Sequence, residues 1–410
     1  MMKKQTENKT PKIGLALAGG GVEGATYEIG ALCALQEFIE GVRFDDLDIY
    51  VGVSAGALVA SGLAGGLTPW ELNRISHSHG TTLPPITPES FFRPATGEYW
   101  YRFTQIPESL FKAFWQHLSN PRDISLLGSL SRITHHIPSG LFDNAPLREY
   151  LELLFREYDL PNDFKKARRP LRVVTTDLEA GETAVFGEPG RDGIPVSLAV
   201  QASTALPGLF MPVEIEGRYY IDGIARKTVH ASVALEAGMD LVFSINPLVP
   251  LESPKVARTQ KELKDHLRRS GIPYIMAQTL RTIIHSRMTT GFERYEQEYP
   301  DSDLLLFEPP ADDESMFYTN VFSFSKRLKV ADRAFQHIRS QLLKNKAYYE
   351  EVLAQHGLSL NYEKLYRITT LENHPKLGVL DSGDVSANLE ATLNRLDEVL
   401  SDGEQLSKTG

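Results

Sequence analysis

Residues 48–67 read DIYVGVSAGALVASGLAGGL. The apolar run at the start of this stretch predicts a buried strand, and the small residues after it predict a helix that follows directly. Between them lies Gly52-Val53-Ser54-Ala55-Gly56, a pattern typical of the sharp strand-to-helix turn that presents a serine nucleophile. Because Gly52 and Gly56 lack a Cβ, the strand and the helix can approach closely. Ser54 is therefore the candidate nucleophile.

The same strand, turn and helix pattern opens the chain and recurs along it. Apolar runs that predict strands lie at 13–18, 48–53, 171–175, 241–245 and 304–307, and they alternate with segments of helical spacing such as 26–38 and 55–67. Residues 211–215 and 218–221 predict a hairpin around Glu216-Gly217. We therefore expect an α/β fold, a three-layer α/β/α sandwich with a mainly parallel central sheet, plus C-terminal helices.

A glycine turn lies between the first predicted strand and helix, at Gly19-Gly20-Gly21-Val22-Glu23-Gly24. Backbone amides at a helix N-terminus attract negative charge, so this turn beside the serine elbow predicts an oxyanion hole. The spacing also fits a dinucleotide fingerprint. That alternative expects an acidic residue at the end of the next strand, where this chain has Gly52-Val53-Ser54.

A base for the serine is predicted at Asp222, which follows the hairpin strand and precedes Gly223. An Asp-Gly pair is also a common turn, so the prediction depends on the other two motifs. His230 leaves a Ser-His-Asp triad open, as do His266 and His285, although a triad fold usually places several strands before the elbow. A metal site is a weaker alternative, because no acidic metallohydrolase pattern accompanies the remaining histidine candidates, which are His77, His79, His135 and His136.

Together these motifs resemble the patatin-like phospholipase family across about residues 13–247. Further similar segments are QASTALPGLFMP at 201–212, LFDNAPL at 141–147 and TDLEAG at 176–181. The resemblance implies a Ser–Asp dyad of Ser54 and Asp222 acting on lipid or phospholipid esters, with no cofactor or metal. It also implies supporting roles for glycines and amides: an oxyanion hole at Gly19, Gly20, Gly21 and Val22, elbow glycines Gly52 and Gly56, and motif glycines Gly24 and Gly223.

Two residues depart from the family pattern. Glu23 stands where the family usually carries a basic residue, and Ile224 stands where Gly or Ala normally follows the Asp-Gly pair. Thr228 also lies close to the place where the family often has a proline. A carboxylate near the oxyanion would oppose its negative charge. The alternative is therefore a catalytically weak member that binds lipid as a scaffold or regulator.

Composition limits the classes of partner and compartment. The 43 basic and 53 acidic residues give a net charge of −10, which argues against a nucleic-acid binder. A single cysteine, Cys33, excludes an internal disulfide. The polar first dozen residues lack a signal-peptide pattern, and the weakly polar run at 55–67 is too short to span a bilayer. We expect a cytoplasmic protein that can contact a membrane peripherally.

Two stretches outside these motifs are candidates for that contact. Nine aromatic residues lie within 91–115, in what we expect to be an insertion near 88–138 and not a sheet element. Residues 255–287 hold eight Lys or Arg against two acids. Segments 91–118 and 255–287 are thus possible membrane contacts, with ordinary packing and a solvated helix face as their respective alternatives. The expected organisation is a disordered start at 1–11, a catalytic domain at 12–250, a helical extension at 251–380 with a late strand near 303–308, and a polar tail at 381–410.

Overall fold

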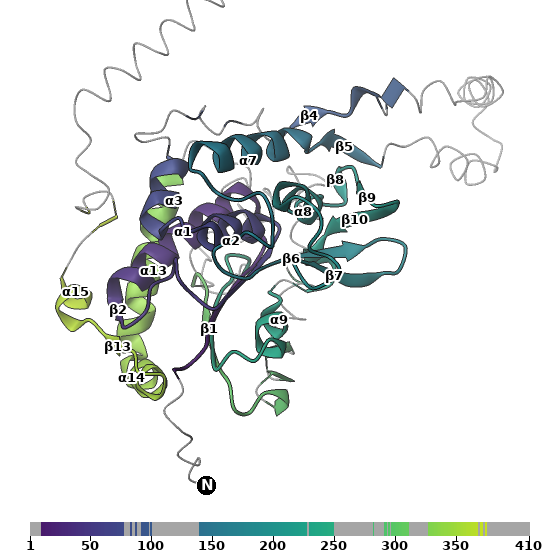
Figure 1. Cartoon of the computed structure of the whole chain (residues 1–410). Helices are drawn as coiled ribbons and strands as arrows, with labels where there is room; N and C mark the ends of the chain where they lie inside the picture. The colour runs from purple at the N-terminus through teal and green to yellow at the C-terminus, as the bar shows by residue number, and fades with distance from the viewer. Residues whose placement is uncertain are drawn as a thin grey trace, which may run out of the picture.

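A computed structural model gives the fold of the chain (Figure 1). It describes residues 10–77, 92–97, 99–100, 139–227, 229–249, 297–310 and 327–367, together with residues 83, 87, 282, 291–292, 294–295, 370–371 and 374. The strands among them are β1 (Ile13–Leu17), β2 (Ile39–Glu40), β3 (Ile49–Val53), β4 (Arg93–Pro94), β5 (Gly140–Asp143), β6 (Leu171–Asp177), β7 (Glu182–Phe186), β8 (Gly208–Phe210), β9 (Val213–Ile215), β10 (Arg218–Asp222), β11 (Leu241–Ile245), β12 (Asp303–Phe307) and β13 (Ser359–Leu360). The helices are α1 (Gly21–Phe38), α2 (Ala55–Gly65), α3 (Pro69–Ser76), α7 (Ala145–Glu157), α8 (Val196–Ser203), the 3₁₀ turn η3 (Gly223–Ala225), α9 (Ala231–Glu236), α13 (Arg327–Lys344), α14 (Lys346–Gln355) and α15 (Tyr362–Tyr366).

The central sheet has eight strands in the order β12-β11-β1-β3-β6-β10-β9, with β7 also paired to β6. The pairs from β12 to β6 are all parallel. The pairs of β10 with β6, β9 with β10 and β7 with β6 are antiparallel. The predicted mainly parallel sheet is therefore confirmed, and its antiparallel part is the predicted hairpin together with β7.

Both faces of the sheet are covered, as the alternation of buried residues along the strands shows. Leu15, Leu17 and Tyr50 pack into the larger core with α1, α2, α3 and α13. Their neighbours Ala16 and Val51 pack into a second core with α9 on the other face. Helices on two sides of one sheet make the expected three-layer sandwich (Figure 1).

Helix α13, the first of the three described helices that follow β12, packs directly on α1 and belongs to the larger core. The two helices cross so closely at Gly30 that a Cβ there would lie 2.2 Å from the Ala331 carbonyl oxygen. Phe38 of α1 and Phe335 of α13 also pack against each other, with tilted rings whose centroids are 5.1 Å apart. A glycine at position 30 is thus required by the helix crossing, because any side chain there would meet backbone.

Several elements differ from what the sequence predicts. Helix α1 begins at Gly21, five residues before the apolar spacing becomes helical, so the glycine turn itself forms the first turn of the helix. Within the aromatic stretch, Arg93–Pro94 pairs with β5, so the expectation that no part of this stretch joins a sheet is wrong. Two-residue strands of this kind carry too few residues to show the period-two pattern. Most of segments 91–118 and 255–287, and the tail at 381–410, lie outside the described residues.

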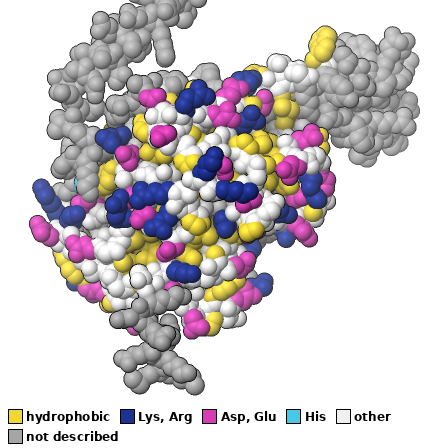
Figure 2. All heavy atoms as spheres, in the orientation of Figure 1, with side chains coloured by type: hydrophobic (Ala, Val, Ile, Leu, Met, Phe, Trp, Pro, Cys, Tyr) yellow, Lys and Arg dark blue, Asp and Glu magenta, His cyan; other side chains and the backbone are white. Residues whose placement is uncertain are grey.

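On the face shown in Figure 2, basic and acidic side chains of the described residues are interspersed with apolar ones. Among the helices that the structure describes, none combines the length and the apolar character that crossing a bilayer requires.

Candidate active site

Strand β6 brings Ser54 and Asp222 together. One edge of its 173–177 stretch is occupied by β7. The opposite edge pairs first with β3, up to Val53 against Val174, and then with β10, from Asp222 against Thr175. Strands β3 and β10 therefore end next to each other on one edge of β6. The residue after β3 is Ser54, so the two predicted catalytic residues meet at this junction.

Ser54 sits in a strained turn between β3 and α2. Its φ is 54° and its ψ is −123°, a left-handed conformation that is uncommon for a residue with a side chain. The elbow glycines make this turn possible. A Cβ on Gly52 would lie 2.5 Å from Ala57 Cα, and one on Gly56 would lie 2.4 Å from the Ala18 carbonyl oxygen. Both positions thus exclude a side chain, as the motif predicts.

Asp222 is buried and faces Ser54. Its carboxylate accepts hydrogen bonds from the Ile224 amide, at 2.9 Å, and from the Ser54 hydroxyl. Burial raises the pKa of Asp222 to about 7, against the lowering effect of these two hydrogen bonds. A carboxylate whose pKa lies near neutrality is a far better proton acceptor than an ordinary aspartate and is still ionised in part at neutral pH.

The glycine turn lies against the serine. A Cβ on Gly19 would come within 3.1 Å of Ser54 Cβ and 3.6 Å of its Oγ. Gly21 has a φ of 62°, and the Gly24 amide donates to the Gly20 carbonyl at 2.9 Å, which closes the first turn of α1. The amides of Gly20, Gly21 and Val22 therefore head the helix, where no intrahelical acceptor serves them.

The two departures from the family pattern also lie at this site. Glu23 is in the first turn of α1 and is 6% exposed, so its side chain does not extend into solvent. Ile224 donates its backbone amide to Asp222, and a Cβ on Gly19 would lie 3.2 Å from the Ile224 Cδ1. The Ile224 side chain therefore packs beside the glycine turn. Thr228 lies outside the described residues.

His230 is buried near the dyad but bonds elsewhere. Its Nε2 donates to the Gly223 carbonyl at 3.4 Å. Burial is the main cause that lowers the pKa of His230 to about 4, so the ring is neutral at physiological pH. Asp222 instead pairs directly with the Ser54 hydroxyl, which favours the dyad over a triad through His230. His77 bonds the Asn73 carbonyl on α3, whereas His79, His135, His136, His266 and His285 lie outside the described residues.

Ser203 is a site residue that the motifs do not identify. Its hydroxyl accepts the Ser54 backbone amide at 2.8 Å and donates to the Val174 carbonyl at 2.6 Å. It thereby ties the strained elbow to β6. The sequence signal was its place in the 201–212 segment, which resembles the family but carries no catalytic pattern of its own.

A second link joins the segments at 141–147 and 201–212. The side-chain amide of Asn144 donates to the backbone carbonyl of Gln201 at 2.8 Å, and the side-chain amide of Gln201 donates to Asn144 Oδ1 at 3.2 Å. Thr176 of the third similar segment donates to the Asp222 carbonyl at 3.2 Å. All three segments therefore contribute to the surroundings of the dyad.

The chain was compared with known proteins. A family model described as patatin-like phospholipase matches residues 15–235. An uncharacterized protein of Acanthamoeba polyphaga mimivirus is 24% identical over 227 residues, which cover 53% of this chain and 62% of that protein. The chain thus spans less than two thirds of the length of this relative.

Solved structures with some similarity include VipD from Legionella pneumophila, at 17% identity and a TM-score of 0.34, covering 81% of this chain and 67% of that one. Human GIVD cytosolic phospholipase A2, in complex with methyl gamma-linolenyl fluorophosphonate, is 13% identical with a TM-score of 0.30, covering 84% and 61%. These TM-scores are low, and the fold assignment stands on the strand order described above. Because the family model covers 221 of the 410 residues, with Ser54 and Asp222 both inside it, the chain belongs to the patatin-like phospholipase family.

Proposed function

We propose that the chain is a serine esterase that cleaves acyl chains from phospholipids or lysophospholipids, with Ser54 as nucleophile and Asp222 as base. The observation that carries this proposal is the hydrogen bond from the Ser54 hydroxyl to a buried Asp222 whose pKa is about 7. Membership of a lipid hydrolase family supports the reaction class.

In the proposed reaction, Asp222 accepts the hydroxyl proton as Ser54 Oγ attacks the ester carbonyl. The amides of the glycine turn donate to the oxyanion of the tetrahedral intermediate. When the intermediate collapses, the bond to the alcohol oxygen breaks and Asp222 returns its proton to that oxygen. A water then attacks the acyl-enzyme with Asp222 as base, and the fatty acid leaves as Ser54 recovers its proton.

The elbow supports this mechanism by holding Oγ in place before the substrate arrives. The backbone amide of Ser54 is fixed by its hydrogen bond to Ser203 Oγ. On the other side, the glycine turn leaves no room beside the serine, because a Cβ on Gly19 would lie 3.1 Å from Ser54 Cβ. Pre-positioning of this kind removes much of the entropic cost of reaching the transition state.

A fluorophosphonate probe tests the nucleophile, because it labels a serine only when that serine is activated. We expect the full-length protein to be labelled and Ser54→Ala to be unlabelled. Ser61→Ala is the matched control, since Ser61 lies on α2 and its hydroxyl bonds the Leu58 carbonyl. Labelling of Ser54→Ala at the wild-type level would contradict the assignment. Absence of labelling in the wild type would favour the alternative of a catalytically weak lipid-binding member, to which the buried Glu23 points.

The reaction type is tested with a lipid panel read by mass spectrometry. Diacyl phospholipids with different chains at the two positions show which ester is cut, and the matching lysophospholipids show whether a second chain is required. We expect Ser54→Ala to lose more than about 10³-fold in kcat/KM on every substrate that the wild type cleaves, because no other group takes over the nucleophile's role. Retained turnover would place the nucleophile elsewhere.

A further inference from the structure

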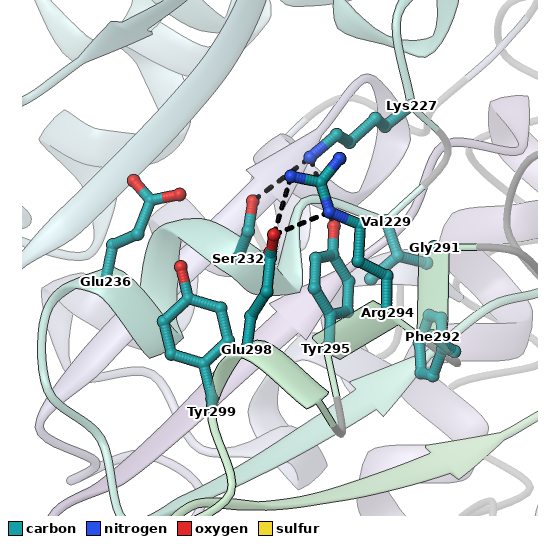
Figure 3. Close-up of a pocket in the computed structure, with 10 residues that line it drawn as sticks. All are labelled: Lys227, Val229, Ser232, Glu236, Gly291, Phe292, Arg294, Tyr295, Glu298 and Tyr299. Carbon is teal, nitrogen blue, oxygen red and sulfur yellow. Dashed lines mark hydrogen bonds and ion pairs between the residues drawn. The ribbon is translucent and has the colours of Figure 1, made fainter.

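A second polar site lies next to the catalytic turn, in a cavity of about 190 Å³ between α9 and the described residues of a later segment (Figure 3). These residues are Gly291, Phe292, Arg294, Tyr295, Glu298 and Tyr299. Cavities that hold a whole drug-sized ligand are larger, at about 300–1,000 Å³. The dyad residues do not line it. Its size and its charged lining fit a small polar group better than an acyl chain.

One end of the cavity is built to bind an anion. Lys227 Nζ donates to the Tyr295 hydroxyl at 3.2 Å and to the Ser232 hydroxyl at 3.4 Å. Both hydroxyl residues are 6% exposed, and the ammonium lies 5.4 Å from the centroid of the Tyr295 ring. No carboxylate pairs with Lys227 among the described residues. Since the two oxygens already accept from Lys227, their own O–H groups and the remaining ammonium N–H can donate to one incoming anion.

The other end of the cavity is acidic. Burial raises the pKa of the Tyr299 hydroxyl, and the negative charges of Glu236 and Glu298 raise it further. The Glu298 carboxylate is turned toward Arg294, whereas the Glu236 carboxylate lies on the Tyr299 side (Figure 3). Glu298 is neutralised by Arg294 at 2.6 Å. Glu236 forms no ion pair in the part of the chain that the structure describes, and Figure 3 shows it beside Tyr299 at the far side from Lys227. This end therefore retains one carboxylate and an aromatic hydroxyl, which suit a cation.

The separation of the two ends follows from the helical spacing of their residues. Ser232 and Glu236 are four residues apart on α9 and share one face of that helix. Tyr295 and Tyr299 have the same spacing, and the Tyr299 amide donates to the Tyr295 carbonyl at 2.8 Å. One helical turn, about 5.4 Å, thus separates an anion site from a cation site. That is close to the separation of phosphorus and nitrogen in an amino-alcohol phosphodiester.

The anion site is also connected to the catalytic base through the backbone. The turn η3 follows Asp222 directly, and the Lys227 amide donates to the Gly223 carbonyl at 3.4 Å. We propose that this cavity binds the zwitterionic headgroup of a phospholipid, with the phosphate at Lys227, Ser232 and Tyr295 and the ammonium at Glu236 and Tyr299. The inference rests on the proposed phospholipid hydrolysis for its biological meaning, and binding is measured separately from turnover.

The test is calorimetric titration of the full-length protein with three soluble probes: glycerophosphoethanolamine, glycerophosphocholine and glycerol 3-phosphate. Lys227→Gln should weaken all three by about tenfold or more, because it removes the charge-assisted donor. Glu236→Gln should weaken the two zwitterions by about tenfold and leave glycerol 3-phosphate equal or tighter, since it removes only the cation partner. Lys329→Gln on α13 and Glu350→Gln on α14 are exposed charge-matched controls and should bind as the wild type does.

Two outcomes would overturn the proposal: wild-type protein that binds no zwitterion at tens of millimolar, or a Glu236→Gln variant that weakens all three probes equally. Hydrolysis measured on phospholipid vesicles tells whether the natural ligand of the cavity is a lipid headgroup or a soluble phosphodiester. The wild type should hydrolyse phosphatidylethanolamine in preference to phosphatidylglycerol, and Glu236→Gln should reduce that ratio; an unchanged ratio would refute the lipid source. Wild-type hydrolysis without probe binding would reject the headgroup site alone, whereas binding without hydrolysis would reject the proposed reaction alone.

Discussion

The pH dependence of ester hydrolysis should report the ionisation of Asp222. Only the carboxylate form can accept the Ser54 proton, and burial raises the pKa of Asp222 from 3.8 to about 7. The ionised fraction then rises from about one tenth at pH 6 to about nine tenths at pH 8, so kcat/KM should rise about tenfold over that range. His230 contributes nothing there, because its pKa is lowered to about 4.

The assay follows release of butyric acid from a short-chain ester by pH-stat titration, so that no leaving group titrates within the range. His230→Ala is the control and should keep a midpoint near pH 7, with activity expressed per folded protein. A flat profile from pH 6 to 8, or a midpoint near 4, would refute the raised pKa. A midpoint that disappears in His230→Ala would instead favour the triad.

The same shift has a consequence for folding stability. The pKa of Asp222 is higher in the folded state than in the unfolded state, so protonation of Asp222 stabilises the folded protein. This contribution to the free energy of unfolding is fully present below about pH 4 and is lost as pH rises through about 7. A shift of about three units corresponds to at most about 4 kcal/mol. Asp222→Asn should therefore be inactive yet more stable than wild type at pH 8, by less than this limit, because an amide has only one acceptor for the Ile224 amide and the Ser54 hydroxyl. Urea unfolding measures the difference; a less stable variant at pH 8 would contradict the argument.

Three further substitutions test the surroundings of the dyad. Ser203→Ala leaves the Ser54 backbone amide without its acceptor, so it should lower kcat more than it changes KM. It should also lower the free energy of unfolding in urea by roughly 1–3 kcal/mol. An unchanged kcat would show that Ser203 has no positioning role. Gly56→Ala should unfold at a lower urea concentration than the control Ala57→Gly, because the new Cβ would lie 2.4 Å from the Ala18 carbonyl oxygen. Equal urea midpoints for the two variants would contradict that contact. Glu23→Gln should raise kcat/KM several-fold, less so at high salt, whereas a fall would show that Glu23 organises the turn.

The sequence alone was sufficient to predict the layers of the fold and the candidate nucleophile. Strands β1, β3, β11 and β12 are short apolar runs followed or preceded by helices, and this pattern depends only on local residue order. The elbow is equally local, because Gly52 and Gly56 act on the backbone within two residues of Ser54. Asp222 was predicted as the base from its place after the hairpin strand together with the other two motifs, and the family resemblance implies the same role. The assignment stays a prediction until the variants are measured.

Only the tertiary structure decided which distant groups meet. Asp222 reaches Ser54 because β10 pairs with the edge of β6 that β3 leaves free, and such a register depends on the partner strand as much as on the residues of β10 themselves. The contact of Ser203 with Ser54 and the cavity at Lys227 also depend on the tertiary structure, because each brings together residues that are far apart in the chain. The tertiary structure also sets the pKa of Asp222, because the shift comes mainly from desolvation and Asp222 is buried only when the surrounding segments pack together.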